Sequence, residues 1–234
     1  MNKVGMLAFG HCTKLREITV PHSVTDLEDF AFYGCKSLEK AVIKADISEL
    51  KQYMFSTCTA LKEVSLPASI EYIRTWAFDS CVSIKNITLP EKLKGIEANT
   101  FNSCEMLTEI TFPASLEEIG SYVFDGCKQL KTVTCLRETP LEGMAMGESV
   151  FESIDKTKCE LKVPKGHKAE YAAAEQWKDF TNITEHELTG ISLPVNQNKD
   201  LKTSIFTING QHLPANAQPT EGIYIINGKK MYVK

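Results

Sequence analysis

The sequence predicts a solenoid in which short parallel strands stack with a period of 23 residues. Three observations predict this fold class. A phenylalanine recurs at that period, a cysteine always follows it three residues later, and an alternating apolar run comes after the cysteine. A fixed period of roughly 20 to 50 residues is typical of chains whose repeats bury their apolar sides only against their neighbours.

Two columns of the repeat have no exceptions between the N-terminus and about residue 136. The phenylalanines are Phe9, Phe32, Phe55, Phe78, Phe101 and Phe124, and the cysteines are Cys12, Cys35, Cys58, Cys81, Cys104 and Cys127. Because the spacing holds through six copies, the repeats are expected to share one structure.

Residues 77–90, AFDSCVSIKNITLP, show the elements of one repeat. Ile87 and Leu89 alternate with polar residues, which predicts a short strand with both side chains pointing inward, and a proline ends it. Such strands from successive repeats are expected to lie in parallel about 4.8 Å apart. Leu93 and Ile96 predict a second short strand or extended turn, and the corner A-F-x-x-C predicts a helical or 3₁₀ turn.

The pattern AF-x-x-C-x-x-L-x-x-I-x-L-P-x-S-V-x-x-I closely resembles the BspA-like leucine-rich repeat of bacterial surface proteins, over residues 4–136. The resemblance implies a leucine-rich-repeat solenoid in a secreted or cell-surface protein. It also implies adhesion, since family members are associated with binding extracellular-matrix proteins. The chain begins without a signal peptide, and Val4 falls in the column of Leu27, so the sequence predicts a fragment of a longer precursor with a signal upstream.

Three regions follow from the pattern. Residues 1–136 hold six leucine-rich repeats, the first truncated at its N-terminal side. Residues 137–187 hold a degenerate seventh repeat, marked by Phe151, and a capping helix. Residues 188–234 are expected to form a small β-hairpin module.

The capping helix is predicted over HKAEYAAAEQWKDF, residues 167–180, which is rich in alanine and glutamate. The spacing of Tyr171, Ala174 and Trp177 predicts an amphipathic helix across the open end of the solenoid. The alternative is an aromatic ligand platform at Tyr171 and Trp177.

The last region carries Asn209-Gly210 and Asn227-Gly228, each between alternating apolar runs. This dipeptide favours the tight turn of a β-hairpin, so two hairpins are predicted. The ending partly resembles the sorting domains of the type nine secretion route, although it is shorter, and the alternative is a purely structural cap.

The cysteine column predicts buried free thiols that pack as small apolar groups. Equivalent positions on parallel repeats point the same way, whereas a disulfide needs two Cβ atoms aimed at each other. A zinc site needs clustered ligands, and the histidines are scattered along the chain, so no metal site is predicted. Cys12 lies beside His11, but the equivalent cysteines lack that neighbour, which favours packing over a nucleophilic role there as well.

Composition excludes several function classes. A net charge of −4 and a pI near 5.8 give no electrostatic reason to bind nucleic acid, and no apolar run approaches the roughly 18 residues of a membrane span. The chain has no Gly-rich phosphate loop, no His-Glu-x-x-His motif and no nucleophilic serine elbow. The sequence therefore predicts a protein that is not an enzyme and has neither catalytic nor cofactor-binding residues.

Two columns are candidates for a binding face. Thr88 and Thr111 belong to a column on the outward side of the strands, where strand propensity is the alternative explanation. Tyr53, Trp76 and Tyr122 belong to an aromatic column two residues before the phenylalanines, and such rings offer contact area with a polar handle. The alternative for these rings is a half-buried spacer between turns, and Asn99 interrupts their column.

The sequence thus predicts a non-enzymatic, surface-exposed or secreted interaction module. Its extended face would bind a host extracellular-matrix protein, a cell-surface protein or a glycan. The alternative is a scaffold or spacer that presents another domain and has no ligand of its own. No oligomeric state is predicted.

Overall fold

The computed structural model describes residues 2–187 and, beyond them, the backbone of residues 205–207, 212–213, 222–226 and 229–233. The chain divides into two compact units, Met1–Leu188 and Thr189–Lys234.

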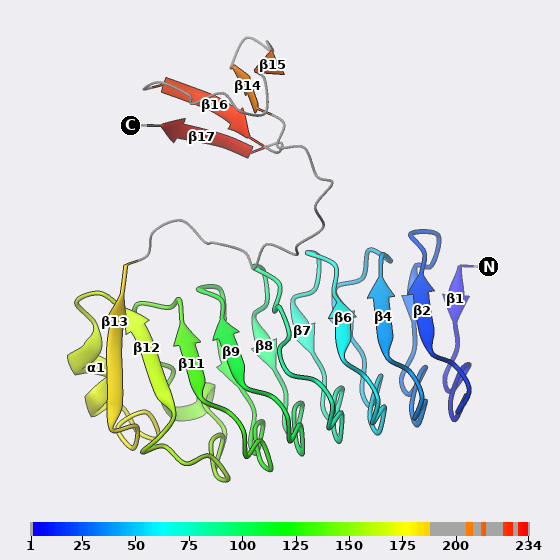
Figure 1. The fold of residues 1–234 in the computed structure, drawn as a ribbon, viewed down its shortest axis with the longest axis horizontal. Helices are drawn as coiled ribbons and strands as arrows, with labels where there is room; N and C mark the ends of the chain where they lie inside the picture. Colours follow the sequence, from blue (N-terminus) through cyan, green and yellow to red (C-terminus); the bar gives the residue numbers. More distant parts are fainter. Residues whose placement is uncertain (1, 188–204, 208–211, 214–221, 227–228, 234) are drawn as a thin grey trace. The chain divides into compact units, whose positions relative to one another are not determined.

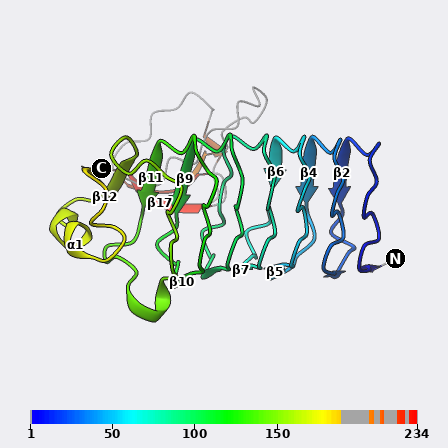
Figure 2. The same cartoon turned by 90° about the horizontal axis from the view of Figure 1, so that it is seen from below.

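The first unit is a parallel β-solenoid with strands on two opposite sides (Figures 1 and 2). The longer strands form one side, here the long-strand face: β2 (Glu17–Val20), β4 (Lys40–Ile43), β6 (Glu63–Ser65), β9 (Glu109–Phe112), β11 (Thr132–Cys135), β12 (Glu160–Pro164) and β13 (Asn182–His186). Two-residue strands form the other, here the short-strand face: β1 (Lys3–Val4), β3 (Asp26–Leu27), β5 (Glu49–Leu50), β7 (Tyr72–Ile73), β8 (Gly95–Ile96) and β10 (Glu118–Ile119).

The strand register follows the sequence repeat. Glu17 pairs with Lys40 and Lys40 with Glu63 on the long-strand face, while Glu49 pairs with Tyr72 on the short-strand face, and every one of these ladders is parallel. The predicted solenoid fold with its 23-residue period is confirmed. One predicted strand is wrong: residues 86–89 form no ladder, although Ile87 and Leu89 are buried there as expected.

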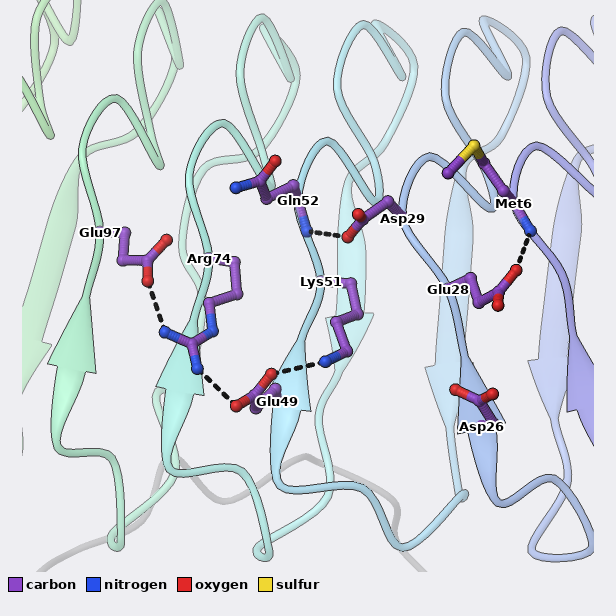
Figure 3. Close-up of a pocket in the computed structure, with 9 residues that line it drawn as sticks. All are labelled: Met6, Asp26, Glu28, Asp29, Glu49, Lys51, Gln52, Arg74 and Glu97. Atoms are coloured by element: carbon purple, nitrogen blue, oxygen red, sulfur yellow. Dashed lines mark hydrogen bonds and ion pairs between the residues drawn. The ribbon is translucent and has the colours of Figure 1, made fainter.

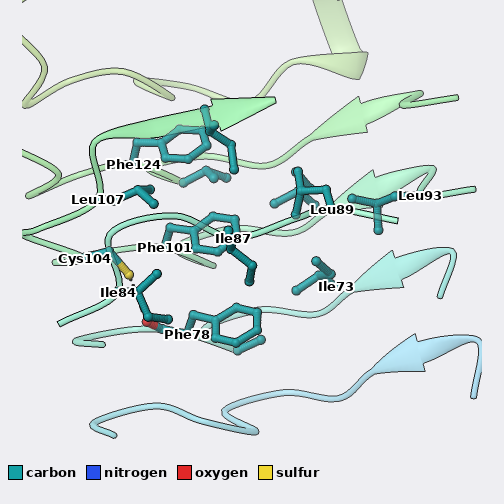
Figure 4. Packing of buried hydrophobic residues seen from close by; sticks show 14 of the residues in the cluster. Ile73, Phe78, Ile84, Ile87, Leu89, Leu93, Phe101, Cys104, Leu107 and Phe124 are labelled. Carbon is teal, nitrogen blue, oxygen red and sulfur yellow. Dashed lines mark hydrogen bonds between the residues drawn. The ribbon is translucent and has the colours of Figure 1, made fainter. Parts of the chain in front are cut away.

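The core is a column of stacked rings with aliphatic side chains on both sides (Figure 4). Successive phenylalanines from Phe9 to Phe124 lie with ring centroids 5.4 to 5.6 Å apart and nearly parallel planes. Phe151 continues the column at 5.8 Å from Phe124, as its assignment to a seventh repeat predicts. Each repeat thus buries its rings only against its neighbours, as in other solenoids.

The C-terminal end of the solenoid differs from the prediction in two respects. The helix α1 covers only Lys168–Ala173, because Ala174 is already extended and Gln176 has a φ of 65°. The chain there turns back and adds β13 beside β12, an eighth turn that the sequence pattern did not reveal. At this turn the side-chain amide of Gln176 accepts the backbone N–H of Val150 and donates to the carbonyl oxygen of Gly147.

The aromatic platform suggested for this end is contradicted by burial. Tyr171 and Trp177 are each 1% exposed, and both use their polar atoms on backbone carbonyls of the preceding loop. The Tyr171 hydroxyl donates to Arg137 O at 2.8 Å and Trp177 Nε1 donates to Leu141 O at 2.9 Å. They close the core instead of facing a ligand.

The second unit contains a four-stranded antiparallel sheet in the order β15-β14-β16-β17. The strands are β14 (Ile205–Thr207), β15 (His212–Leu213), β16 (Gly222–Ile226) and β17 (Lys229–Val233). Antiparallel strands flank each of the two Asn-Gly dipeptides, and the dipeptides themselves lie outside the described residues.

Candidate functional site

The predicted aromatic column occupies a strained backbone position. All six of its members have φ between 52° and 61°: Leu7, Phe30, Tyr53, Trp76, Asn99 and Tyr122. This left-handed region is costly for side chains other than glycine and asparagine. The corner that follows each short strand therefore requires a left-handed residue, and aromatic rings fill four of these six positions.

A second left-handed position occurs four residues later in every repeat and serves as an internal comparison. It is filled by His11, Gly34, Thr57, Ser80, Ser103 and Gly126. Small residues predominate here, although the backbone requirement is the same. The rings in the first column are therefore present for what their side chains contact and not because the backbone needs them.

Three of these rings, Phe30, Tyr53 and Trp76, form what we call the aromatic ladder. The ring centroids of Phe30 and Tyr53 lie 4.6 Å apart with an interplanar angle of 8°, and those of Tyr53 and Trp76 lie 6.1 Å apart at 4°. Both faces of the Tyr53 ring are thus covered by neighbours. All three side chains are half-buried, so their edges face solvent.

The remaining candidate residues lie apart from the ladder. Asn99 separates Trp76 from Tyr122, which is 41% exposed. Thr88 and Thr111 are exposed on the long-strand side of the solenoid, whereas the ladder follows the short strands. The five predicted residues therefore do not form one site, and the ladder with its short-strand surroundings is the better-built part.

A groove of about 490 Å³ lies on the short-strand face (Figure 3). Its lining residues are Met6, Asp26, Glu28, Asp29, Glu49, Lys51, Gln52, Arg74 and Glu97. Asp29 and Gln52 directly precede the ladder residues Phe30 and Tyr53 in the chain, so groove and ladder are adjacent. Sequence reasoning missed this groove because its charged columns look like an ordinary solvated surface.

Ion pairs between neighbouring repeats hold the groove side chains in place. The guanidinium of Arg74 pairs with Glu97 at 2.5 Å and with Glu49, and it lies 4.8 Å from the centroid of the Tyr72 ring. Lys51 adds a contact to Glu49 at 2.6 Å. Figure 3 shows these side chains converging from three successive repeats.

Two of the groove carboxylates, Glu49 and Glu97, are held in the ionised form. Hydrogen bonds from Arg74 and then Lys51 lower the pKa of Glu49 to about 2. Burial opposes ionisation of Glu97, but hydrogen bonds from Arg74 and Thr75 outweigh it and lower its pKa. These two carboxylates therefore stay charged well below neutral pH.

The cysteine column is a structural ladder and not a chemical site. From Cys35 to Cys127, each thiol of the column donates to the carbonyl oxygen of the phenylalanine in the preceding repeat, as in Cys58 to Phe32 and Cys81 to Phe55, both at 3.1 Å. Burial raises the pKa of Cys81 well above its usual range, which suppresses the reactive thiolate. All eight cysteines are free and seven are buried, which confirms the packing prediction for those seven; the prediction is wrong for Cys12, which is exposed because no earlier repeat covers it in this chain. Within the described residues no cluster of histidine, cysteine and carboxylate side chains could hold a metal ion.

Parallel strands with a 23-residue register, a phenylalanine column and a buried cysteine at each corner define a leucine-rich-repeat protein. The family model for the BspA type leucine rich repeat region, with six copies, matches residues 1–108, 51–168 and 94–217. The chain belongs to this family. Family membership supports a role in protein interaction or as a scaffold.

Two of the solved structures that resemble the chain are leucine-rich repeat proteins of known source. A leucine-rich repeat protein from T. pallidum is 27% identical, with a TM-score of 0.52, over 64% of this chain and 73% of its own. A leucine-rich repeat protein from Bacteroides ovatus is 24% identical, with a TM-score of 0.59, over 80% of this chain and 46% of its own. Among curated proteins none matches the chain.

Two findings concern the cellular location of the protein. None of the helices in the described residues is long and apolar enough to cross a membrane. The resemblance of residues 188–234 to sorting domains has no counterpart in the matches above.

Proposed function

We propose that the chain is a non-enzymatic interaction module at the surface of a bacterial cell or outside it. Its binding surface is the aromatic ladder and the corner residues in line with it, and its partner is a polypeptide. The observation that supports this most is the presence of rings at left-handed positions where the matching second column has small residues. Aromatic side chains are also the commonest energetic anchors of protein interfaces.

The geometry of the ladder favours a polypeptide over a glycan. Sugar rings stack on open aromatic faces, but Phe30 and Trp76 cover both faces of Tyr53. What remains accessible of Tyr53 is its ring edge, which suits the side chains of an extended or flat protein surface. An extracellular-matrix protein is one partner of this kind.

The scaffold alternative rests on the same contacts. Rings that stack on one another stabilise neighbouring repeats, so Tyr53 has a structural use even without a ligand. Tyr122 differs, because it is 41% exposed and no aromatic ring stacks on it within the described part of the chain. An effect of Tyr122 on binding would therefore not follow from the scaffold role.

The test is a variant with Tyr53→Asn, Trp76→Asn and Tyr122→Asn. Asparagine suits a left-handed backbone, and Asn99 already occupies this column, so the variant should lose less than about 2 kcal/mol of unfolding free energy. Binding to immobilised matrix proteins and glycans is measured by biolayer interferometry, and folding by thermal melting.

The matched control is Thr57→Asn with Ser80→Asn, which makes the same change in the second left-handed column. We expect saturable binding to a protein ligand that the aromatic variant loses and the control keeps. If the unmodified chain bound none of the immobilised matrix proteins or glycans, this result would contradict the proposal and favour the scaffold role.

A further inference from the structure

We propose that the groove on the short-strand face docks an extended polypeptide segment bearing lysine or arginine side chains. This rests on the proposed function, because it names the chemistry of the partner that lies beside the aromatic ladder. Three features support it: the charge of the groove, the way the chain itself fills part of it, and the neighbouring ring edges.

The groove carries more carboxylates than its own cations can neutralise. Its carboxylates are Asp26, Glu28, Asp29, Glu49 and Glu97, and the cations in contact with them are Lys3, Lys51 and Arg74. Five negative charges thus meet three positive charges, which leaves an excess of two. A cationic partner is the complement that such a surface favours.

The chain shows how this groove accommodates cationic side chains. The ammonium group of Lys3 lies 3.1 Å from Asp26 and also pairs with Glu28 in the next repeat. Arg74 is held in the same manner between Glu49 and Glu97, which belong to the repeats on either side of it. A cation that pairs with two carboxylates, at least one of them in a neighbouring repeat, therefore occurs at both ends of this groove.

Between Lys3 and Arg74 lies the part of the groove whose carboxylates can still pair with a cation of a partner. The carboxylate of Asp29 accepts the backbone N–H of Gln52 at 3.0 Å, and no cation contacts it among the described residues. Asp26 shares Lys3 with Glu28, and its side chain remains 47% exposed. Asp26 and Asp29 are accordingly the carboxylates that a partner cation would reach.

The ladder next to the groove favours a polypeptide over a small polyamine. Asp29 and Gln52 line the groove, and the half-buried rings of Phe30 and Tyr53 follow them directly in the chain. Lysine and arginine side chains lay their aliphatic stems on apolar surface while their charged ends reach polar groups. An extended strand places alternate side chains about 6.8 Å apart on one side, which lets two cations of one segment enter the groove.

The experiment compares two variants of the full chain that change net charge equally. Asp26→Asn with Asp29→Asn alters the groove, and the amide oxygen introduced at position 29 can still accept the backbone N–H of Gln52. Glu17→Gln with Glu109→Gln removes two exposed carboxylates from the long-strand face. Binding of a hexalysine peptide is measured by isothermal titration calorimetry at low and at physiological salt, with spermine as a second probe.

We expect the groove variant to bind hexalysine roughly tenfold more weakly than the unmodified chain, while the long-strand variant stays within about twofold. Binding should weaken as salt rises, because exposed charges are screened. Equal weakening in both variants, or no binding by the unmodified chain, would overturn the proposal. So would spermine binding as tightly as hexalysine. If groove binding fails while the aromatic variant still loses its matrix ligand, the proposed function stands without this inference.

Discussion

At the scale of single residues, the molecule depends on a thiol and a ring that recur together. The buried thiol at a corner, such as Cys58 or Cys81, donates to the carbonyl oxygen of the phenylalanine in the previous repeat. One side chain thus joins two repeats through a hydrogen bond and through packing. Cysteine is small, apolar and a weak donor, and this combination fits a position that is fully buried and faces a backbone oxygen. The column is therefore invariant along the chain for reasons of packing.

Replacing Cys81 with alanine should destabilise the fold by about 1–2 kcal/mol, since the change leaves a small cavity and removes one of the two hydrogen bonds that the Phe55 carbonyl oxygen accepts, the other coming from the backbone N–H of Cys58. The change in the free energy of unfolding is measured by urea unfolding. The matched control is Cys12→Ala, which changes the exposed member of the same column and should cost less than about 0.5 kcal/mol. Equal costs at both positions would contradict the role assigned to the buried thiols.

At the scale of elements, two-residue strands position charged side chains more accurately than their length suggests. β5, β7 and β8 are stacked in register, so Glu49, Arg74 and Glu97 come from three successive turns and meet around one guanidinium. Neighbouring turns are about 4.8 Å apart, which matches the reach of an arginine between two carboxylates. A network of this kind contributes more than isolated surface pairs do.

This network makes stability depend on acid pH. The pKa of Glu49 is about 2 in the folded chain against an ordinary value of 4.5, and that of Glu97 is also lowered. A folded pKa below the unfolded one contributes stability that is fully present above about pH 4.5 and is lost as the pH falls toward 2. Thermal melting from pH 6 to pH 2 should therefore show a decline that Arg74→Met makes shallower.

The control for the acid decline is Lys85→Met, which removes one positive charge from an exposed side chain with no ion pair among the described residues. Its melting curve should follow that of the unmodified chain through the same pH range. An Arg74→Met variant with an unchanged slope would show that the decline arises elsewhere.

At the scale of the whole molecule, the solenoid has one continuous core in place of separate small ones. The ring column runs from Phe9 to Phe151, and Phe180 and Trp177 contact its last member edge-on. Burial is therefore complete in the middle and less complete at the first repeat, where Phe9 and Leu15 are only partly covered. Access to the core should be correspondingly uneven along the axis.

Thiol reactivity reports this unevenness. All eight cysteines lie in residues 12–159 and are free, and only Cys12 is exposed. We expect one thiol to react quickly with a disulfide reagent in the native protein and the other seven only on unfolding, since burial raises the pKa of most of them. Fewer than seven reactive thiols after unfolding without reductant would indicate disulfides and contradict the packing model.

The period, the columns and the inward side of each strand could be predicted from the sequence alone, because a solenoid repeats one set of local contacts. The residue types in a column therefore indicate whether that position is buried. Periodicity ends where the repeat does. It therefore did not reveal the shortened helix or the eighth turn at β13. The missing ladder at residues 86–89 was not revealed either, because the apolar columns continue there and only the strand pairing is absent.

Which surface residues lie close together could be seen only from the tertiary structure. The spacing alone placed Tyr53, Trp76 and Thr111 in columns, but their positions on different sides depend on how the chain bends between its two strands. The groove likewise joins residues 23 positions apart that meet only when turns stack. A one-dimensional pattern records which residues are equivalent, whereas contacts between different columns arise from the path of the backbone in three dimensions.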